Sequence, residues 1–394
     1  MSEDPKDWEV ATRLVRGGTV RSGFGETAEA LYLTQSFIYD TAEGADARFA
    51  GNEPGYIYSR YGNPTVQMFE DRLALLEGAE ACRATASGMA AVLLSLMGLL
   101  RAGDHVVAGK ALFGSCRWIL PNWGPRFGVE TTFVTGSDTD AWRRAMRPTT
   151  KVVFIESPAN PLLEITDIAA VAAAAREVGA KVVVDNVFAT PIYQKPLTMG
   201  ADIIVYSATK HIDGQGRVLG GAVLGARALL EEAYRDLIRH TGPALSPFNA
   251  WVLLNGLVTL DLRVRAMSAS AAELADRIAA HAKVKTIRYP GRAAHPQHEI
   301  AARPFTGGGN LIAFDLGSRE AAFGFLNALE LVAISNNLGD ARSMATHPTT
   351  TTHRAMTDEQ RAEIGLTPGW VRVSIGLEGA RDLARDIERA LDRA

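Results

Sequence analysis

The chain has 394 residues, of which 47% are hydrophobic and 22% charged, so its composition excludes disordered, collagen-like and coiled-coil proteins. Its 41 basic and 44 acidic residues give a formal net charge of −3, which argues against nucleic acid or a membrane surface as the partner. Two scattered cysteines, Cys82 and Cys116, are too few for a disulfide framework or a zinc site, so we expect a protein of the reducing cytoplasm.

The first 62 residues show no sustained hydrophobic period and end in a polar, aromatic run at 56–64. The first ten residues lack the apolar run of a signal peptide, so we expect no secretion. A segment that cannot bury itself loses conformational entropy on ordering unless contacts elsewhere offset the loss. We therefore predict that residues 1–62 form an arm that contacts a neighbouring subunit.

Strand-length apolar runs alternate with helical patterns between residues 63 and 255. The runs at 151–156 and 181–185 flank an alanine-rich helical pattern at 168–178, for which Asp167 is a suitable N-cap and Gly179 a suitable end. A further run follows at 203–206. Because these runs are apolar on both faces, they predict the buried, mostly parallel sheet of an α/β domain.

A second, smaller domain is predicted over residues 256–394. A long helical pattern covers 251–282, and three strand-like runs follow before a final helix at 383–391. The three runs are 310–315, 331–334 and 370–375. This mixture of helices and strands predicts an α+β domain.

Polar side chains follow three strands of the predicted parallel sheet. Segment 156–161 contains Asn160, Asp185 ends the next strand, and Lys210 lies just beyond the third. In open α/β sheets ligands bind outside the carboxyl ends of the strands. We therefore expect a carboxamide, a carboxylate, hydroxyls and an amine to meet in one crevice.

An anion site is predicted where residues 84–89 lead into the apolar helix at 90–100. The free N–H groups and the dipole of a helix N-terminus favour a phosphate, and Gly88 permits a close approach of the backbone. The helix itself is far shorter than the roughly 20 residues of a membrane span, so we expect no membrane insertion.

The combination of a strand-end lysine, a strand-end aspartate and a phosphate site is what pyridoxal 5′-phosphate (PLP) requires. A lysine amine forms the Schiff base, and a carboxylate keeps the pyridine nitrogen protonated, which makes the ring an electron sink. Ser207 and Thr209 could donate to the phosphate. Taken singly, Asp185 could be a cap or turn residue and Lys210 a solvated charge.

Six segments resemble, in order and along almost the whole chain, the motifs of the Cys/Met-metabolism PLP enzymes, the cystathionine γ-synthase family. They are 58–65, 87–89, 156–161, 184–186, 207–210 and 371–378. The resemblance implies a fold type I, aspartate aminotransferase-like architecture with an N-terminal arm, a large PLP domain and a small C-terminal domain. It also implies self-association as a homotetramer of two active dimers.

The same resemblance implies a role for individual residues. Lys210 would hold the cofactor covalently, and Asp185 would meet its pyridine nitrogen. Arg372 would bind the substrate α-carboxylate as a planar fork, although a surface ion pair is an alternative for this residue. The remaining cofactor contacts would come from Ser87, Gly88, Met89, Ser207 and Thr209, from Tyr58 and Arg60 of a neighbouring subunit, and from Asn160, which with Asn337 would also bind substrate.

Departures from the general pattern narrow the subgroup. Phe113 stands where most relatives have a tyrosine, so stacking on the cofactor ring would survive but the phenolic acid or base would be lost. Segments 211–221, 335–340 and 347–353 are similar to those of bacterial O-succinylhomoserine sulfhydrylases. His347 and His353 lack a third ligand nearby for a metal.

That subgroup implies a transferase of methionine biosynthesis, which converts O-succinyl-L-homoserine and sulfide to L-homocysteine and succinate. An O-acetylhomoserine sulfhydrylase, a cystathionine γ-synthase or a γ-lyase on the same site remain alternatives. So does a Schiff-base enzyme without PLP, or a binding protein.

Overall fold

The computed structural model describes residues 4–302 and 307–394 and divides into two compact units. The first unit contains the chain up to Gly98 together with Val205–Asp213 and Arg217–Thr259. The second contains Leu99–Ile204, Gly214–Gly216 and the chain from Leu260 onward. The predicted boundaries at residues 62 and 255 stay a prediction.

The first unit is built around two antiparallel strands, β1 (Ala81–Thr85) and β7 (Gly221–Gly225), with the end of β6 (Ile203–Ser207) next to β7. Helices α3, α4, α9 and α10 contact these strands or one another. Their bounds are α3 Pro64–Glu77, α4 Gly88–Met97, α9 Arg227–Thr241 and α10 Pro247–Val258.

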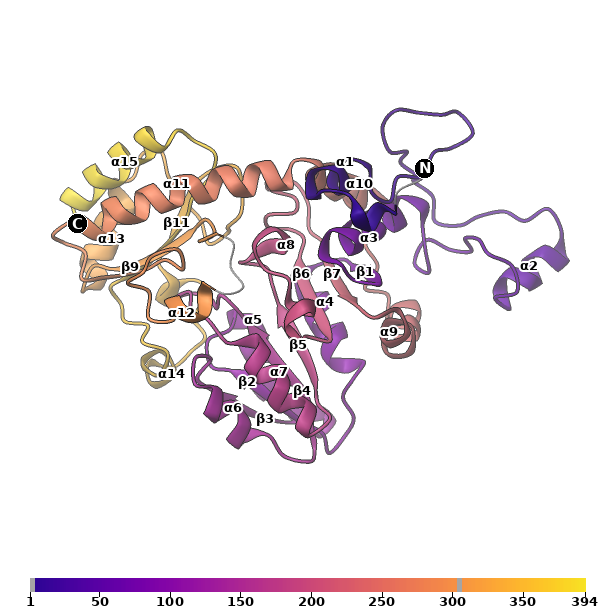
Figure 1. The fold of residues 1–394 in the computed structure, drawn as a ribbon, viewed down its shortest axis with the longest axis horizontal. Coiled ribbons are helices and arrows are strands. Elements are labelled where there is room, and N and C mark those ends of the chain that lie inside the picture. Colours follow the sequence, from indigo (N-terminus) through magenta and orange to yellow (C-terminus); the bar gives the residue numbers. More distant parts are fainter. Residues whose placement is uncertain (1–3, 303–306) are drawn as a thin grey trace. The chain divides into compact units, whose positions relative to one another are not determined.

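The start of the chain in the first unit has little regular structure. Its elements are a 3-10 turn at Pro5–Asp7, α1 (Val10–Arg16) and α2 (Ala42–Phe49), and the short helices α1 and α2 were not predicted. The buried Arg72 of α3 binds the backbone of Gly17 and the carboxylate of Glu29, which holds the first part of this segment. The part that carries α2 projects away from the rest of the unit (Figure 1).

In the second unit, four parallel strands lie in the order β5-β4-β2-β3. Residues of β4 and β5 are buried on both faces, as the uninterrupted apolar runs predict. Asp167 caps α7 by accepting a hydrogen bond from Ala170 N, and Gly179 follows at a positive φ, so this helix is as predicted. The strands are β2 His105–Gly109, β3 Glu130–Val134, β4 Thr150–Glu156 and β5 Lys181–Asp185, and the helices are α5 Gly114–Asn122, α6 Thr139–Ala145, α7 Ile168–Glu177 and α8 Thr190–Tyr193, with 3-10 turns at Gly124–Phe127 and Pro196–Met199.

The second unit also contains a five-stranded, mostly antiparallel sheet in the order β10-β11-β12-β9-β8. Its core is formed with the long helix α11, α13 and α15, which lie together in Figure 1. The strands are β8 Thr286–Arg288, β9 Leu311–Asp315, β10 Ala333–Ile334, β11 Met344–Thr346 and β12 Trp370–Ser374. The helices are α11 Leu260–Ala280, α12 His298–Ala301, α13 Arg319–Ala328, α14 Asp358–Glu363 and α15 Ala380–Asp392, with a 3-10 turn at Pro348–Thr350.

The helical pattern at 251–282 proves to be two helices. The chain leaves helical geometry at Thr259, between α10 and α11, and the two helices belong to different units. The sequence gives no sign of this break, because the hydrophobic period continues across it and no Gly or Pro marks the end of α10. In the described residues, every helix is too short or too polar to cross a membrane.

Candidate active site

In the first unit, the turn before α4 lies against the end of β6. Ser87 caps α4 by accepting a hydrogen bond from Ala90 N at 3.2 Å. A Cβ built on Gly88 would lie 2.5 Å from Ser207 Cβ and 2.8 Å from Ser207 Oγ, so only glycine fits there. The structure therefore brings the predicted Ser87-Gly88-Met89 turn and Ser207 together. Helix N–H groups beside a hydroxyl suit an anion such as a phosphate.

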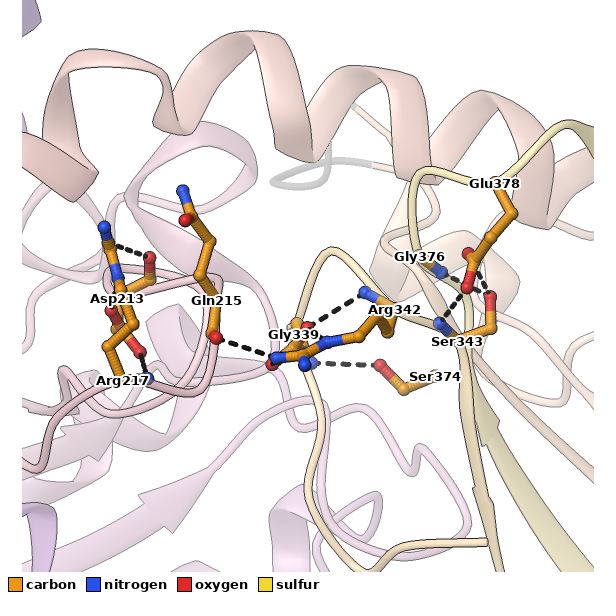
Figure 2. Close-up of polar contacts among 10 residues, drawn as sticks. Asp213, Gln215, Arg217, Gly339, Arg342, Ser343, Ser374, Gly376 and Glu378 are labelled. Atoms are coloured by element: carbon orange, nitrogen blue, oxygen red, sulfur yellow. Dashed lines mark hydrogen bonds and ion pairs between the residues drawn. The ribbon is translucent and has the colours of Figure 1, made fainter. Parts of the chain in front are cut away.

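The turn that carries Lys210 is fixed by its own hydrogen bonds. Lys210 N donates to Ser207 O at 3.2 Å, and Thr209 Oγ1 accepts from Gly220 N at 3.1 Å. The buried Asp213 binds Arg217 through Nε at 2.8 Å and through the backbone N at 2.6 Å, an ion pair drawn in Figure 2. These bonds hold the chain on both sides of Lys210.

The predicted pair Tyr58 and Arg60 lies elsewhere in the same unit. The Arg60 guanidinium stands over the rings of Tyr58, at 5.3 Å, and Tyr61, at 5.0 Å, and donates to the carbonyl of Arg239. Tyr58 is 39% exposed. Both residues thus face a surface of the unit, and their predicted contact with a neighbouring subunit stays a prediction.

In the second unit, two carboxylates stand side by side at the ends of neighbouring strands. Glu156 of β4 is the register partner of Asp185 of β5. Burial raises the pKa of Asp185 above its usual range, and burial together with the charge of Asp185 raises the pKa of Glu156. A cation placed against Asp185 would reverse this shift. The arrangement therefore suits a protonated ring nitrogen.

Glu156 is a residue whose function the sequence reasoning missed. Its Oε2 accepts from Phe113 N at 2.7 Å, and its Oε1 accepts from Asn160 N at 2.8 Å. One buried carboxylate thus joins Phe113, at the start of α5, to the loop that carries Asn160. The sequence did contain a signal for this role, because Glu156 is the last residue of its strand just as Asp185 is the last residue of the neighbouring strand.

Arg372 of β12 is joined to Asn160 in the second unit. Arg372 is 1% exposed, its Nη1 donates to Asn160 Oδ1 at 2.7 Å, and its Nη2 donates to Asn336 O at 3.0 Å. The carbonyl of Asn337 is 3.5 Å from Nη2. Nε is buried without a hydrogen bond to any described residue. Burial lowers the pKa of Arg372 to about 10, so the guanidinium is charged at neutral pH.

The loop before β11 is tied to the strand that carries Arg372. Gly339 N donates to Ser374 Oγ at 2.9 Å, and Ser343 donates to the carboxylate of Glu378 through N at 2.7 Å and through Oγ at 2.8 Å. Arg342 joins Asp340, at 2.8 Å, to the backbone of Gln215 (Figure 2). This network sets the position of the carbonyls that Arg372 binds.

The residues present in each unit fit pyridoxal 5′-phosphate. The first unit offers a turn in which any Cβ on Gly88 would collide with Ser207, together with the amine of Lys210. The second offers a buried carboxylate whose raised pKa calls for a cation, and an arginine with an unused buried Nε. Each unit thus offers groups of the kind that this cofactor requires, and the cofactor when bound would supply an electron sink.

Comparison with known proteins assigns the family. The model of the Cys/Met metabolism PLP-dependent enzymes matches residues 11–392, and the chain belongs to this family. The predictions of the family, of PLP as cofactor and of a PLP-dependent enzyme are thereby confirmed.

Relatives resemble the chain over nearly its whole length. The O-succinylhomoserine sulfhydrylase of Mycobacterium tuberculosis is 54% identical over 98% of this chain and 97% of its own. The O-succinylhomoserine sulfhydrylase of Pseudomonas aeruginosa is 46% identical over 96% of this chain and 94% of its own. An L-methionine gamma-lyase of Pseudomonas putida is 42% identical over 97% and 96%.

Solved structures confirm the predicted fold class. A cystathionine gamma synthase from Xanthomonas oryzae has a TM-score of 0.93 at 36% identity, with 98% of each chain covered. A putative O-acetylhomoserine (thiol)-lyase from Campylobacter jejuni, with a TM-score of 0.94, 29% identity and coverage of 98% and 100%, carries a pyridoxyl-lysine phosphate. The chain therefore has the α/β fold of these enzymes, with a mostly parallel large sheet and a smaller second sheet.

Proposed function

We propose that this enzyme catalyses γ-replacement on O-succinyl-L-homoserine, in which sulfide displaces succinate and L-homocysteine forms. The observation that carries the proposal is the 54% identity, over 98% of the chain, to the O-succinylhomoserine sulfhydrylase of Mycobacterium tuberculosis. The Cγ–O bond to succinate breaks and a Cγ–S bond to sulfide forms, with no net oxidation or reduction. The product is the sulfur-bearing precursor of methionine.

Lys210 carries the proton transfers in this proposal. Its Nζ would hold the cofactor and, once the substrate is bound, would take the proton from the substrate Cα. The bound cofactor supplies a ring that delocalises the electron pair left at that carbon. Asp185 keeps the ring nitrogen protonated. Phe113 would contact the ring but has no acidic group, so Lys210 would also move the later protons.

Arg372 and the two asparagines bind the substrate. The planar guanidinium of Arg372 takes the α-carboxylate, a geometry that a lysine cannot reproduce. The side chain of Asn160, which already accepts from Arg372 at 2.7 Å, orients the substrate against the cofactor. Asn337 lies in the segment whose carbonyls contact the same guanidinium. These contacts support one binding position for the substrate carboxylate.

The phosphate is bound by the turn of the first unit and by a neighbouring copy of the chain. Ser87, Gly88 and Met89 supply the helix N-terminus, and Ser207 and Thr209 supply hydroxyls. Tyr58 and Arg60 reach the phosphate of a neighbouring subunit. The exposure of this first segment supports the proposal, since Phe24 is 98% and Ile38 92% exposed in the single chain.

The proposed domain organisation follows from that assembly. Residues 1–62 form the arm, 63–255 the PLP-binding domain and 256–394 the small domain. Two such dimers form a homotetramer. We place the enzyme in the cytoplasm, an assignment supported by Cys82 and Cys116, which are both buried and form no disulfide.

The test is product analysis with the purified holoenzyme. O-succinylhomoserine is supplied with sulfide, with cysteine, or alone, and homocysteine, cystathionine and 2-oxobutyrate are measured. We expect homocysteine from sulfide to dominate. Cystathionine from cysteine as the main product would make the enzyme a synthase, and rapid 2-oxobutyrate release without any acceptor would make it a γ-lyase.

A Lys210→Ala variant tests the catalytic assignment. We expect loss of turnover and of the cofactor's absorbance band in the near-visible region, because no amine is left to hold the cofactor or to move the α proton. A Lys181→Ala variant, at an amine 45% exposed and paired with Asp202 at 2.8 Å, is the control and should keep both properties. Turnover by the Lys210 variant would contradict the assignment.

A further inference from the structure

His353 is a fully buried histidine in the second unit, in the loop after the 3-10 turn Pro348–Thr350. It is 0% exposed. Its backbone is fixed, because His353 N donates to Pro348 O at 2.9 Å and His353 O accepts from Met356 N at 3.2 Å. The loop around it is pressed against α5, since a Cβ on Gly114 would lie 2.4 Å from Thr352 O. The ring therefore has a fixed place beside the start of that helix.

The ring of His353 lies among the residues of the second unit that we propose to bind the substrate. Nδ1 lies 2.8 Å from Thr352 Oγ1. The carbonyls of Leu112 and Asn160 lie close enough to favour a proton on the ring, while the charges of Arg372 and Arg117 oppose one. Nε2 is buried without a bond of standard hydrogen-bond geometry to a described residue.

These contacts indicate which tautomer and which protonation state the His353 ring adopts. When the Thr352 hydroxyl donates to Nδ1, the neutral ring carries its proton on Nε2. Burial and the two nearby guanidinium groups, Arg372 of β12 and Arg117 of α5, lower the pKa of His353 to about 4. The ring is thus neutral at physiological pH and carries one N–H, in buried surroundings that include the carbonyls of Leu112 and Asn160.

We propose that His353 is a positioning residue, whose Nε2–H binds the carbonyls of Leu112 and Asn160 and so holds Phe113 and Asn160 in place beside Arg372. Bonds of this kind are often long in an unliganded site and shorten when the substrate is bound. Asn160 then presents its Oδ1 to Arg372 at the distance of 2.7 Å that leaves Nε free for a carboxylate. The inference rests on the proposed function, because it assigns Arg372 to the substrate.

The test compares His353→Leu, which keeps volume but loses the N–H, with His353→Gln, which keeps a donor. For His353→Leu we expect the KM for O-succinylhomoserine to rise about tenfold, with a smaller change in kcat, and His353→Gln to restore the KM to within about threefold. His105→Gln is the matched control, because His105 is also buried and also bonded to a threonine hydroxyl, at 2.8 Å from Thr150, and it should leave the KM unchanged.

A second readout does not depend on turnover. Binding of a non-reacting amino acid to the holoenzyme, followed through the cofactor's absorbance, should weaken in His353→Leu by the same factor as the KM rises. If His353→Leu does not fold, Thr352→Val, which removes only the hydroxyl that orients the ring, should show a smaller loss in the same direction.

Two results overturn the proposal. One is an unchanged KM and unchanged amino-acid binding in folded His353→Leu, or in Thr352→Val where the former does not fold. The other is a glutamine variant as weak as the leucine variant. Failure of the proposed function looks different, because the wild-type enzyme itself would then make no homocysteine while the amino-acid binding comparison would still report on His353.

Discussion

The turn at Gly88 in the first unit and the surroundings of Arg372 in the second, which we propose as two anion sites, are built in opposite ways. At Gly88 the proposed site consists of backbone and a small hydroxyl, and its space exists only because a side chain is missing: a Cβ would lie 2.5 Å from Ser207 Cβ. At Arg372 the site is a full charge that is 1% exposed and held by carbonyl oxygens and a carboxamide.

This difference indicates which kind of substitution should damage each site. A backbone site tolerates little added volume but contains no group whose charge can be lost. A buried charge is costly to desolvate, so it depends on partners with the correct geometry and tolerates no change of shape. Substitutions that add volume should therefore damage the first site, and those that alter geometry at constant charge should damage the second.

The largest effect is expected for Gly88→Val. The added side chain would occupy the space of Ser207, so we expect the affinity for PLP to fall more than about 100-fold and the cofactor's absorbance band to be lost. The measurement is a titration of the cofactor-free protein with PLP. Gly124→Ala, compared with Gly88→Ala, is the control, because the nearest atom to a Cβ at Gly124 is Val129 O at 3.5 Å, an ordinary contact. Wild-type PLP affinity in Gly88→Val would show that the turn is not the phosphate site.

A smaller effect is expected for Arg372→Lys, which keeps the charge and loses the fork. We expect kcat/KM to fall about 100-fold, with the PLP affinity unchanged, because a single ammonium cannot replace the paired donors. Steady-state kinetics and the absorbance spectrum measure the two properties. Arg265→Lys, at an arginine side chain 57% exposed, should be neutral. Equal loss of PLP binding would mean that Arg372 serves the cofactor and not the substrate.

The smallest effect concerns the stability of the cofactor-free protein and its dependence on pH. Burial raises the pKa of Glu156 and of Asp185, so the folded chain holds protons that the unfolded chain releases above about pH 4. This contribution to stability is fully present at low pH and is lost as the pH rises through the folded pKa values.

Glu156→Gln removes one titrating group and keeps an acceptor for Phe113 N or Asn160 N. In both proteins we expect the free energy of unfolding to fall between pH 5 and pH 8. The fall should be about 2 kcal/mol smaller in Glu156→Gln than in the wild type. Denaturant unfolding at several pH values measures it. His353 contributes the opposite slope, because its pKa of about 4 makes the fold lose stability as the pH falls below about 6.5, and this slope is common to both proteins. Parallel pH profiles would contradict the account of Glu156.

Much of the fold could be predicted where one stretch of sequence determines its own structure. The run at 181–185 is apolar on both faces, and it forms β5 as expected. Asp167 and Gly179 delimit α7, because a cap and a positive-φ glycine act within one turn of the helix. The helix start beside Gly88 was predicted for the same reason, since a helix N-terminus is a local feature.

What could not be predicted depends on residues that are far apart in the sequence. Arg372 donates to Asn160, 212 positions away, and no period or spacing in the chain reports that bond. The role of Glu156 in joining Phe113 to Asn160 is likewise visible only once β4 and α5 are folded. The helices α1 and α2 were missed because each is short and largely exposed, so neither shows a hydrophobic period.

The most direct test of the proposed function is the ratio of kcat/KM for O-succinylhomoserine to that for O-acetylhomoserine, each measured with sulfide and the purified holoenzyme. Homocysteine is the product in both reactions, so the ratio reports only how the enzyme reads the leaving group. We predict a ratio well above one. A ratio below one, with homocysteine still formed, would contradict the assignment as a succinyl-specific sulfhydrylase and leave the cofactor site intact.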